Sequence, residues 1–438
     1  METHRMKPSS SAIPHIRIVG GGVAGLILAT RLGHVMGSRG TAQISLIDRS
    51  PTHVWKPMLH TFAAGTWNIY QQQVQFLVHA GSHHFKYIPG EMAGLDREGR
   101  RLRLAPLRAN GETIADARDL DYDLLILATG SRANDFAIPG VAEHCHFIDS
   151  QREADAFNDK LRTHVGRSFL HGDGIRIAIG GGGATGVELA AELTRMVELA
   201  GGYGEVDIRS RLRITLLESG PRILAAFPER VAASATEQLR GLGVDVRVGV
   251  KIVGADAGGY RLESGERIEA DLKVWAAGIR ASEAVGNCGL ELNRARQIVV
   301  APNLQARNDD AIFAVGDCSS LIPEGAERPL PSTAQVANQQ ALHLVAHLPS
   351  WVSERRPVPP FVFRDLGALV SLGEYNAFGT LGRFGLFPGG FVEGRFAQLS
   401  HAALYRRHQL ALHGPAHAGL LWLAERLNAL TQPSIRIT

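Results

Sequence analysis

The sequence Val19-Gly20-Gly21-Gly22-Val23-Ala24-Gly25 decides the fold of this chain, because it contains the pattern Gly-x-Gly-x-x-Gly directly after a short apolar run. Residues 15–19 read as a β-strand and residues 26–30 as the start of a helix, which is the order that the pattern requires. The first glycine permits a tight turn, the second lets backbone approach a pyrophosphate, and the third lets helix pack on strand. The stretch therefore predicts an α/β unit that binds a dinucleotide.

The same pattern occurs a second time, as Gly181, Gly183 and Gly186. Residues 175–179 before it are rich in isoleucine, and residues 187–193 behind it have the composition of a helix. Strand, glycine turn and helix thus follow one another again, which is the context that makes such a motif informative. We predict that one polypeptide binds two dinucleotides.

An acidic residue ends the next predicted strand in each unit, where a carboxylate can accept hydrogen bonds from ribose hydroxyls. Asp48 follows Gly25 by 23 residues, and Glu218 follows Gly186 by 32. The second interval is long, and we interpret the polar stretch 201–211 as an insertion between helix and strand. The alternative is that one of the two copies is a glycine-rich turn without a ligand.

Small-residue turns follow two further strands. Residues 120–127 read as one buried strand that leads into Ala128-Thr129-Gly130-Ser131, and residues 270–275 lead into Ala276-Ala277-Gly278. Nucleotides bind at the carboxyl ends of strands in open α/β sheets, so these turns are expected to border the two sites.

A third strand, 311–315, precedes Gly316 and Asp317 and is expected to return to the first domain. The predicted fold class is α/β, with two Rossmann-like dinucleotide-binding domains, the second inserted in the first, and a C-terminal helical membrane-association region. The predicted boundaries are a disordered lead at 1–12, a first domain at 13–150 and 299–364, a second domain at 151–298, and the C-terminal region at 365–438.

Composition limits the classes of protein that the chain can belong to. It has 438 residues, 45% of them hydrophobic, a formal charge of +3 and three cysteines without a Cys-x-x-Cys pair. We therefore expect a globular, intracellular protein of two or three domains with no nucleic-acid partner, no disulfide framework and no metal site. No apolar run reaches the roughly 18 residues of a spanning helix, and residues 1–12 lack the apolar core of a secretory signal.

The C-terminal region reads as two helices, 401–413 and 416–430, separated by Gly414-Pro415. The second helix has one apolar stripe, flanked by Trp422, and basic residues lie close by on the first. Such a surface is suited to an anionic lipid interface, and the alternative is a helix pair that packs on the protein or on a second subunit. The stripe consists of Leu420, Leu423, Leu427 and Leu430, and the basic residues are Arg406, Arg407 and His408.

From residue 16 to its end the chain resembles the type II NADH dehydrogenases, single-subunit flavoproteins with two dinucleotide-binding domains. The resemblance implies FAD in the first domain, NADH in the second, and a membrane quinone as electron acceptor. It further implies a respiratory enzyme without proton pumping, peripheral on the cytoplasmic side of the inner membrane, and leaves a homodimer open. The blocks that carry it are Thr52-His53-Val54-Trp55-Lys56-Pro57-Met58-Leu59-His60 with 63–65, 134–136 with 139–141, 183–189, 274–279, and 334–340.

The resemblance also implies the residues that hold each cofactor. Those expected at FAD are Gly20, Gly21, Gly22, Val23, Ala24, Gly25, Asp48, Arg49, Met92, Ala128, Thr129, Gly130, Gly316, Asp317, Ala334 and Gln335. Those expected at NADH are Gly181, Gly183, Gly186, Glu188, Glu218 and Gly278. Glu218 favours NADH over NADPH, because a carboxylate repels the 2′-phosphate, while Arg222 nearby leaves NADPH open.

Four residues are expected to act in catalysis. The resemblance places Glu188 between nicotinamide and flavin and Lys56 close to the isoalloxazine; the alternatives are a first-turn helix acid and a solvated surface lysine. Gln335 and Gln339 are four residues apart, so on a helix they share one face and can present amides to the flavin or a quinone carbonyl.

The chain departs from the family at Thr61, where members often have Glu, and at Glu374, where they often have a basic residue. Both changes concern the quinone end. Rival interpretations are a sulfide:quinone oxidoreductase, for which Cys145 and Cys318 are the conceivable redox pair, and a redox-sensing protein that holds FAD and NADH without turnover.

Overall fold

The computed structural model describes residues 13–67, 73–201, 208–373, 375–381 and 391–431, so the predicted lead 1–12 lies outside the described residues. The chain forms two compact units. Unit 1 comprises Met1–His53, Val74–Ser131 and Ala281–Phe363, and unit 2 comprises Val54–Gln73, Arg132–Arg280 and Arg364–Thr438.

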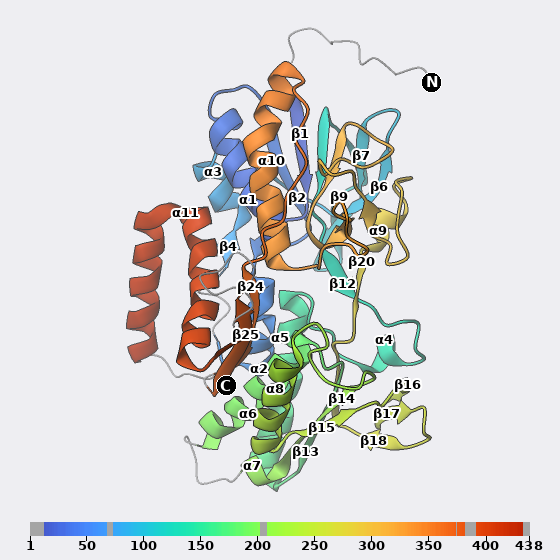
Figure 1. Ribbon diagram of the computed structural model, residues 1–438, viewed down its shortest axis with the longest axis vertical. Helices are drawn as coiled ribbons and strands as arrows, with labels where there is room; N and C mark the ends of the chain where they lie inside the picture. Colours follow the sequence, from blue (N-terminus) through green and yellow to red (C-terminus); the bar gives the residue numbers. More distant parts are fainter. Residues whose placement is uncertain (1–12, 68–72, 202–207, 374, 382–390, 432–438) are drawn as a thin grey trace. The chain divides into compact units, whose positions relative to one another are not determined.

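A five-stranded parallel sheet forms the centre of unit 1 (Figure 1). Its strand order is β22-β11-β1-β2-β5, and helices α1 (Val23–Leu32) and α10 (Ala334–Glu354) pack against each other. Strand β1 is almost wholly buried, because it lies between two parallel neighbours with its faces covered. The strands are β1 (His15–Val19), β2 (Gln43–Asp48), β5 (Lys86–Pro89), β11 (Leu124–Leu127) and β22 (Ile312–Ala314).

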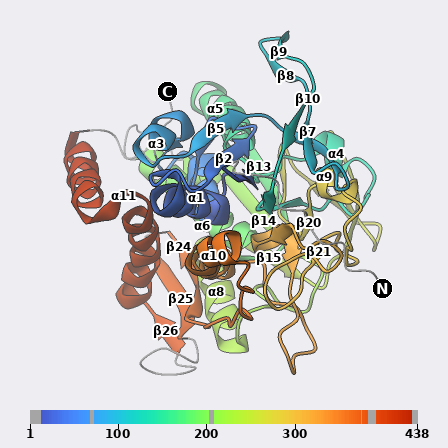
Figure 2. The same ribbon diagram turned by 90° about the horizontal axis from the view of Figure 1, so that it is seen from above.

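The predicted strand 120–127 is in fact two strands that belong to different sheets. Its first part lies in β10 (Arg118–Asp121), which pairs antiparallel with β7 (Arg101–Leu104), and the chain joins the parallel sheet only at Leu124. The sequence pattern does not separate these two strands, because both contain leucines. Figure 2 shows the hairpin of β8 (Leu107–Ala109) and β9 (Glu112–Ala115) extending beyond β7 and β10.

Shorter elements complete unit 1. They are η1 (Gly33–Gly37), β3 (Thr52–His53), β4 (Val74–Gln75), α3 (Phe76–Ser82), β6 (Met92–Asp96), α9 (Glu283–Gly286), β21 (Ile298–Val299), η4 (Gly316–Cys318) and β23 (Ser319–Ser320). β12 (Ser131–Ala133) and β20 (Ile279–Ala281) contain two of the points where the chain passes between the units.

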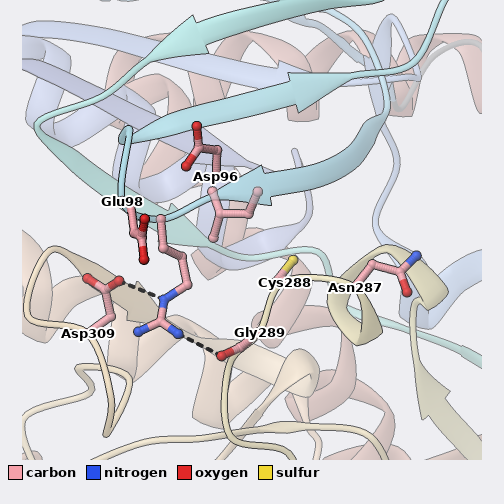
Figure 3. Close-up of a pocket in the computed structure, with 8 residues that line it drawn as sticks. Asp96, Glu98, Asn287, Cys288, Gly289 and Asp309 are labelled. Carbon is pink, nitrogen blue, oxygen red and sulfur yellow. Dashed lines mark hydrogen bonds and ion pairs between the residues drawn. The ribbon is translucent and has the colours of Figure 1, made fainter.

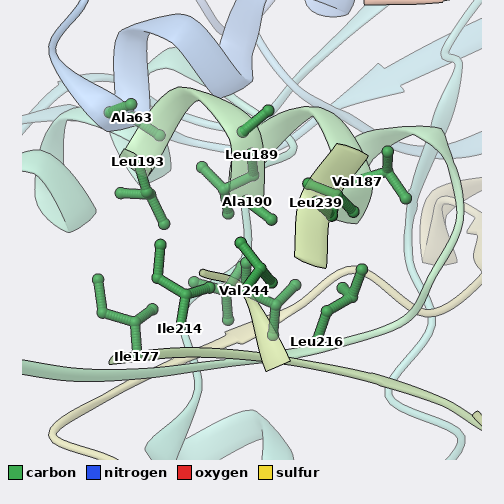
Figure 4. Close-up of a cluster of buried hydrophobic side chains, with 14 of the residues drawn as sticks. Ala63, Ile177, Val187, Leu189, Ala190, Leu193, Ile214, Leu216, Leu239 and Val244 are labelled. Atoms are coloured by element: carbon green, nitrogen blue, oxygen red, sulfur yellow. The ribbon is translucent and has the colours of Figure 1, made fainter. Parts of the chain in front are cut away.

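Unit 2 repeats the plan with a four-stranded parallel sheet of order β15-β14-β13-β19. Apolar side chains of α6 (Ala184–Gly201), including Leu189, Ala190 and Leu193, point toward Ile177 and Ile214 of the sheet and form the core (Figure 4). The other elements of this part are α4 (Val141–His144), α5 (Gln151–His171), β13 (Ile175–Gly180), α7 (Ile208–Arg211), β14 (Leu212–Glu218), α8 (Glu229–Gly241), β15 (Asp245–Val248), β16 (Ile252–Asp256), β17 (Gly259–Leu262), β18 (Arg267–Glu269) and β19 (Leu272–Trp275).

The segment 54–73 is grouped differently from the predicted boundaries, which place it in the first domain. It contains η2 (Lys56–Met58) and α2 (Leu59–Ala64), and α2 packs on α5 and α6 of unit 2. Leu59, Phe62 and Ala63 are buried in the unit 2 core, which is the physical reason for the grouping. An excursion between the two strands β3 and β4 of unit 1 thus supplies part of unit 2.

The C-terminal region contains a sheet that the sequence analysis did not predict. Strands β24 (Gly367–Leu372), β25 (Asn376–Leu381) and β26 (Phe391–Glu393) pair antiparallel. Helix α11 (Arg395–Thr431) is bent at Gly414, where φ is 73°, so it consists of the two predicted helices. They lie side by side in Figures 1 and 2. None of the helices in the described ranges is long and apolar enough to cross a membrane.

Candidate functional site

The first glycine turn lies at the carboxyl end of β1 in unit 1, and packing requires two of its glycines. Gly20 has φ +101°, and a Cβ there would lie 2.3 Å from the carbonyl oxygen of Ala128. A Cβ at Gly25 would lie 1.8 Å from the carbonyl oxygen of Gly20. A Cβ at Gly22 meets nothing within 4 Å. Packing within the protein therefore accounts for Gly20 and Gly25. Open space remains at Gly22, the glycine that is expected to face a pyrophosphate.

Asp48, at the end of β2, binds backbone N–H groups through both carboxylate oxygens, one in this turn and one in the chain just after β2. Oδ2 accepts the N–H of Gly21 at 2.5 Å, and Oδ1 accepts the N–H of Ser50 at 2.7 Å. Burial raises the pKa of Asp48 above its ordinary value. The sequence analysis missed two supports of the same turn: a ring nitrogen of His53 lies 2.8 Å from the carbonyl oxygen of Gly21, and the ring of Phe76 occupies the space where a Cβ of Gly21 would lie.

The second glycine turn, in unit 2, has the same construction. Gly181 has φ +117°, and a Cβ there would lie 2.6 Å from the backbone of Ala276. A Cβ at Gly186 would lie 2.0 Å from the carbonyl oxygen of Gly181, and one at Gly183 meets nothing within 4 Å. Each unit therefore has a turn whose middle glycine borders open space, which fits a dinucleotide phosphate at each.

Glu218 takes the place of Asp48 in the second turn. Its Oε2 accepts the N–H of Gly182 at 2.7 Å, and its Oε1 accepts the N–H of Gly220 at 2.6 Å. Arg222, which left NADPH open, donates to the carbonyl oxygens of Leu224 and Ala225 at 3.0 Å each. The guanidinium of Arg222 thus binds the backbone at 224–225.

Gly278, which follows β19, has φ +72°, and the ring of Phe136 lies 2.7 Å from the position of its Cβ. Packing within unit 2 therefore accounts for a glycine at this position, with or without a nucleotide.

The turn after β22 in unit 1 contains Asp317. Its Oδ2 accepts the hydroxyl of Ser131 at 2.7 Å, and its carbonyl oxygen accepts the amide of Gln297 at 2.9 Å. Gly316 has φ +71°, and its N–H donates to Oε1 of Gln340, a buried side chain of α10, at 2.7 Å. Sequence reasoning missed these three partners, because Ser131, Gln297 and Gln340 are far apart in the chain and belong to no local motif.

The remaining residues predicted at FAD also lie in unit 1. Val23 and Ala24 begin α1, and Ala334 begins α10. Thr129 and Gly130 follow β11, while Met92 is buried at the start of β6. The guanidinium of Arg49 is 3.4 Å from Glu91 on the exposed surface, and the amide nitrogen of Gln339 is 3.5 Å from the side-chain oxygen of Gln335.

Glu188, one turn into α6, is a buried carboxyl of unit 2. Its Oε1 accepts the N–H of Ser371 at 3.1 Å, and Nδ1 of His60 on α2 is 3.5 Å from Oε2. Burial, with a smaller effect of the nearby Glu192 carboxylate, raises the pKa of Glu188 to about 8. A solvated first-turn acid does not have these properties, so the structure argues against that alternative.

Lys56 lies in unit 2, in the loop before α2. Its Nζ is 3.3 Å from Oδ1 of Asp149, and both side chains are partly exposed. The ring of the preceding Trp55 packs against that of His408 of α11, with 4.3 Å between ring centres and an angle of 37° between the ring planes. The Thr61 hydroxyl donates to the carbonyl oxygen of Met58 at 2.7 Å, which explains a threonine there, and Glu374 lies outside the described residues.

The cysteines do not form a redox pair in either unit. Cys145 lies in unit 2 and Cys318 in unit 1. Burial raises the pKa of both thiols, and Cys318 donates to the carbonyl oxygens of Leu127 and Val315 at 3.3 Å. Buried thiols with raised pKa are poor nucleophiles.

A separate pocket of about 500 Å³ in unit 1 is lined by Asp96, Glu98, Cys288 and Asp309, among others (Figure 3). Asp309 binds the guanidinium of Arg97 at 2.9 Å, and burial raises the pKa of Cys288 to about 12. Within the described ranges, no three His, Cys, Asp or Glu side chains are grouped so as to hold a metal. The pocket thus offers neither a reactive thiol nor a metal site.

Two parallel-sheet units with matching glycine turns define the class of protein: an oxidoreductase that binds two dinucleotides. Residues 14–341 match the family of the pyridine nucleotide-disulphide oxidoreductases. The chain is 38% identical to a type II NADH:quinone oxidoreductase of Haemophilus influenzae over 97% of this chain and 99% of that protein. It is 30% identical to one of Staphylococcus saprophyticus over 84% of this chain and 89% of that protein. The chain belongs to the type II NADH:quinone oxidoreductase family.

The fold agrees with this assignment. A solved structure of NDH2 from Plasmodium falciparum in complex with NADH superimposes with a TM-score of 0.84 and 17% identity, covering 98% of this chain and 100% of that one.

Proposed function

We propose that this chain is an FAD-dependent, non-proton-pumping oxidoreductase that passes two electrons from NADH to a membrane quinone. The observation that carries the proposal is the pair of glycine turns, each with open space at its middle glycine and a carboxylate bound to its backbone. Near full-length similarity to relatives named for this reaction supports it. Bound FAD would supply the chemistry, accepting hydride from NADH and returning electrons to quinone.

Unit 1 holds FAD in this proposal. The turn Gly20–Gly25 binds the pyrophosphate. The Asp48 carboxylate, which accepts the N–H groups of Gly21 and Ser50, also accepts hydrogen bonds from the adenosine ribose. Asp317 meets the ribityl chain, with Ser131 and Gln297 fixing its orientation. Ser131 holds one carboxylate oxygen and Gln297 the backbone carbonyl of the same residue, so the other carboxylate oxygen can accept a hydrogen bond from the cofactor in a fixed direction.

Unit 2 holds NADH. Gly181–Gly186 takes the pyrophosphate, and Glu218 accepts the ribose hydroxyls. A 2′-phosphate would meet this carboxylate, and Arg222 is engaged with Leu224 and Ala225, so NADH is the preferred donor. Glu188 lies one turn into the helix behind the glycines and is assigned to the nicotinamide end.

Quinone reduction is assigned to side chains that donate hydrogen bonds. Gln335 and Gln339 present amides from one face of α10 and stabilise the negative charge that develops on quinone oxygens as they are reduced. Lys56, which begins η2, is assigned to the isoalloxazine.

In this proposal the C-terminal helices attach the enzyme to the cytoplasmic face of the inner membrane. Leu420, Leu423 and Leu427 are 65%, 53% and 56% exposed and lie on one helical face. Leu430, the fourth residue of the predicted stripe, lies outside the described side chains. Exposed leucines beside Trp422 suit the boundary between lipid headgroups and acyl chains.

Stopped-flow spectroscopy tests the reaction. The holoprotein is mixed anaerobically with NADH and then with a soluble quinone, and the flavin absorbance is followed. Bleaching by NADH followed by recovery with quinone is expected. Bleaching without recovery would instead favour a redox sensor, and reduction by sulfide but not by NADH would favour a sulfide:quinone oxidoreductase.

A further inference from the structure

Helix α3 of unit 1 carries two apolar side chains on the face that points away from the protein. Leu77 and Val78 are 73% and 66% exposed, more than the described leucines of the C-terminal stripe. Gly81 and Ser82, one helical turn further on, are exposed and small, so the two apolar side chains protrude. Single exposed leucines are ordinary, so the surroundings of this pair decide whether it marks a contact surface.

The opposite face of α3 is fixed in the core of unit 1. The ring of Phe76 occupies the space where a Cβ of Gly21 would lie, so the helix packs on the first glycine turn. Nε2 of the buried His79 is 2.8 Å from the hydroxyl oxygen of Thr30 on α1, and the two helices lie side by side in Figures 1 and 2. Because the inner face is packed in this way, the exposed pair faces solvent.

Acidic residues are scarce in the part of the sequence that contains α3. Residues 13–90 have a single acid, Asp48, whereas the whole chain has 46 basic and 43 acidic residues. Helix α1 and strands β4 and β5, which pack on α3, have no acidic side chain. No carboxylate of these elements therefore offsets positive charge beside the exposed pair. The lysines and arginines of the same range are Arg17, Arg31, Arg39, Arg49, Lys56 and Lys86.

Three cations lie close to α3 and the chain after it. A Cβ at Gly33 or Gly37 of η1 would lie 2.2 or 2.1 Å from the carbonyl oxygen of His83 or His84, respectively, so η1 packs on the chain that follows α3. Exposed arginines lie two residues before Gly33 and two residues after Gly37, and an exposed lysine lies two residues after His84. We call these three residues, together with the exposed apolar pair, the α3 surface: Arg31, Arg39, Lys86, Leu77 and Val78.

A protruding apolar pair with cations close by is suited to a bilayer with anionic headgroups. The apolar side chains enter the boundary between headgroups and acyl chains, and the negative surface potential attracts the cations. A protein partner fits less well, because a stable interface takes roughly 800 Å² per partner and two side chains supply far less. Nucleic acid also fits less well, because its phosphates gain nothing from apolar side chains.

We propose that the α3 surface binds an anionic lipid membrane, which gives unit 1 a membrane contact separate from α11 of unit 2. The exposure of Leu77 and Val78 carries this proposal, together with the exposed cations and the lack of acids on α1, β4 and β5. The lipid contact goes beyond the proposed electron transfer and does not depend on the identity of the electron acceptor.

Two altered holoproteins separate the apolar and the charged parts of the α3 surface. Leu77→Ser/Val78→Ser removes the apolar pair, and Arg31→Gln/Arg39→Gln/Lys86→Gln removes the three positive charges. Each has a matched control at exposed positions elsewhere in unit 1: Ile114→Ser for the apolar pair, and Arg108→Gln/Arg294→Gln/Arg307→Gln for the charges. Thermal unfolding of all four should match that of the unmodified protein, because the altered side chains are exposed.

Sedimentation with phosphatidylcholine vesicles, with and without phosphatidylglycerol, measures binding at limiting lipid. Both altered proteins should bind the anionic vesicles roughly 10-fold more weakly than the unmodified protein, and the controls should not. The charge variant should also lose part of the salt dependence of binding, because fewer charges are left to screen. On vesicles without phosphatidylglycerol, only the apolar variant should be weakened. Unchanged binding of both variants to anionic vesicles would overturn the proposal.

A fluorescent label on α3 gives a local readout that binding through α11 cannot produce. Val78→Cys is labelled with a polarity-sensitive dye in a Cys145→Ser background, because the other two cysteines are buried. With anionic vesicles, the emission should shift to the blue and be quenched by spin-labelled lipid, whereas a label at Ile114→Cys should show neither change.

Absence of both changes at position 78 would overturn the proposal, even where the protein still binds vesicles. A blue shift without vesicles that grows with protein concentration would show that a second copy of the chain covers the surface, and would overturn it as well. If quinone does not reoxidise the unmodified flavin, the proposed electron transfer fails instead, and the label still decides whether α3 meets lipid.

Discussion

At the scale of single residues, packing requires glycine at the first and last position of each glycine turn and leaves open space at the middle one. Gly20 and Gly25 face backbone at distances that no Cβ can adopt, whereas Gly22 faces open space. The same division holds for Gly181 and Gly183. Folding and binding are thus assigned to different members of one motif.

Alanine at each glycine of the first turn should therefore have different effects. Gly20→Ala places a Cβ against the carbonyl of Ala128 with φ +101°, so we expect loss of folded protein. Gly22→Ala should fold normally but bind FAD at least about 10-fold more weakly, because the methyl takes the space of a phosphate. Flavin content and thermal unfolding check both. Equal loss of folding in the two proteins would contradict the assignment.

The donor specificity depends on Glu218. Glu218→Ser removes a negative charge from the expected site of the 2′-phosphate, so the efficiency with NADPH relative to NADH should rise by roughly 10-fold or more. Asp48→Ser, the equivalent change in unit 1, should lower flavin content and leave this ratio unchanged in the protein that retains flavin. Steady-state kinetics with both nucleotides measure the ratio. A constant ratio in Glu218→Ser would remove this carboxylate from the ribose.

Glu188 makes the stability of the protein depend on pH. Its pKa is about 8 in the folded protein against an ordinary value of 4.5, so the folded state holds a proton that the unfolded chain releases between these values. The free energy of unfolding should therefore fall as pH rises from about 4.5 to 8, by on the order of a few kcal/mol.

Glu188→Gln should flatten this dependence and be more stable than the unmodified protein above pH 8, because the amide has no charge to bury. Thermal unfolding of the holoprotein measures the effect. The measurements run from about pH 5 to 9, roughly the range that the two pKa values set. Glu237→Gln should follow the unmodified profile. Parallel profiles for Glu188→Gln and the unmodified protein would contradict the buried, protonated state.

At the scale of elements, α11 combines a buried first segment with an exposed second one. Tyr405, His408 and Gln409 of the first segment are buried, and Arg406 and Gln409 bind Glu425 of the second. Deletion of 401–438 would therefore uncover protein core as well as remove the leucine stripe. Membrane attachment is better tested by substitutions that leave this packing intact.

Leu420→Ser/Leu423→Ser/Leu427→Ser should weaken binding to anionic vesicles roughly 100-fold, since each leucine loses apolar burial worth about 1 kcal/mol or more. Because the three side chains are exposed, thermal stability should not change. Ile114→Ser/Leu170→Ser, which alters exposed apolar residues elsewhere, is the control. Vesicle sedimentation measures binding, and full retention of the triple variant would place the attachment elsewhere.

At the scale of the whole molecule, the chain divides its tasks between two units that share one plan. Gln335 and Asp317 belong to unit 1, and Glu188 and Lys56 to unit 2. The segment 54–73 leaves the strands of unit 1 and supplies His60 and Thr66 to the buried acids of unit 2. In the proposed function, donor binding and acceptor chemistry are thus assigned to different parts of the chain.

The two half-reactions should therefore respond separately to substitution. Gln335→Leu should slow reoxidation by quinone about 10-fold, the effect of losing one hydrogen bond to a developing charge. Reduction by NADH should remain within about twofold. Glu354→Gln at the far end of α10 is the control. Rapid mixing distinguishes the steps, and equal losses in both would contradict the assignment of Gln335 to the acceptor.

The sequence by itself determined the local elements of the fold. Strands 15–19 and 175–179, the two glycine turns, and the acids Asp48 and Glu218 at strand ends appear in the structure where they were predicted. They are predictable because backbone geometry makes local demands that only certain residues meet. A turn with φ near +100° requires glycine whatever surrounds it.

The tertiary structure alone decided which distant groups meet. Four features depend on contacts between segments far apart in sequence: the split of 120–127 into two strands, the sheet β24-β25-β26, the Gln340 support of Gly316 and the hydrogen bond from Thr66 to Glu192 of α6. Glu188 and Glu192 look like ordinary helix acids in sequence. Only burial beside His60, Thr66 and Ser371 changes their chemistry, because a carboxyl's affinity for a proton is set by its surroundings.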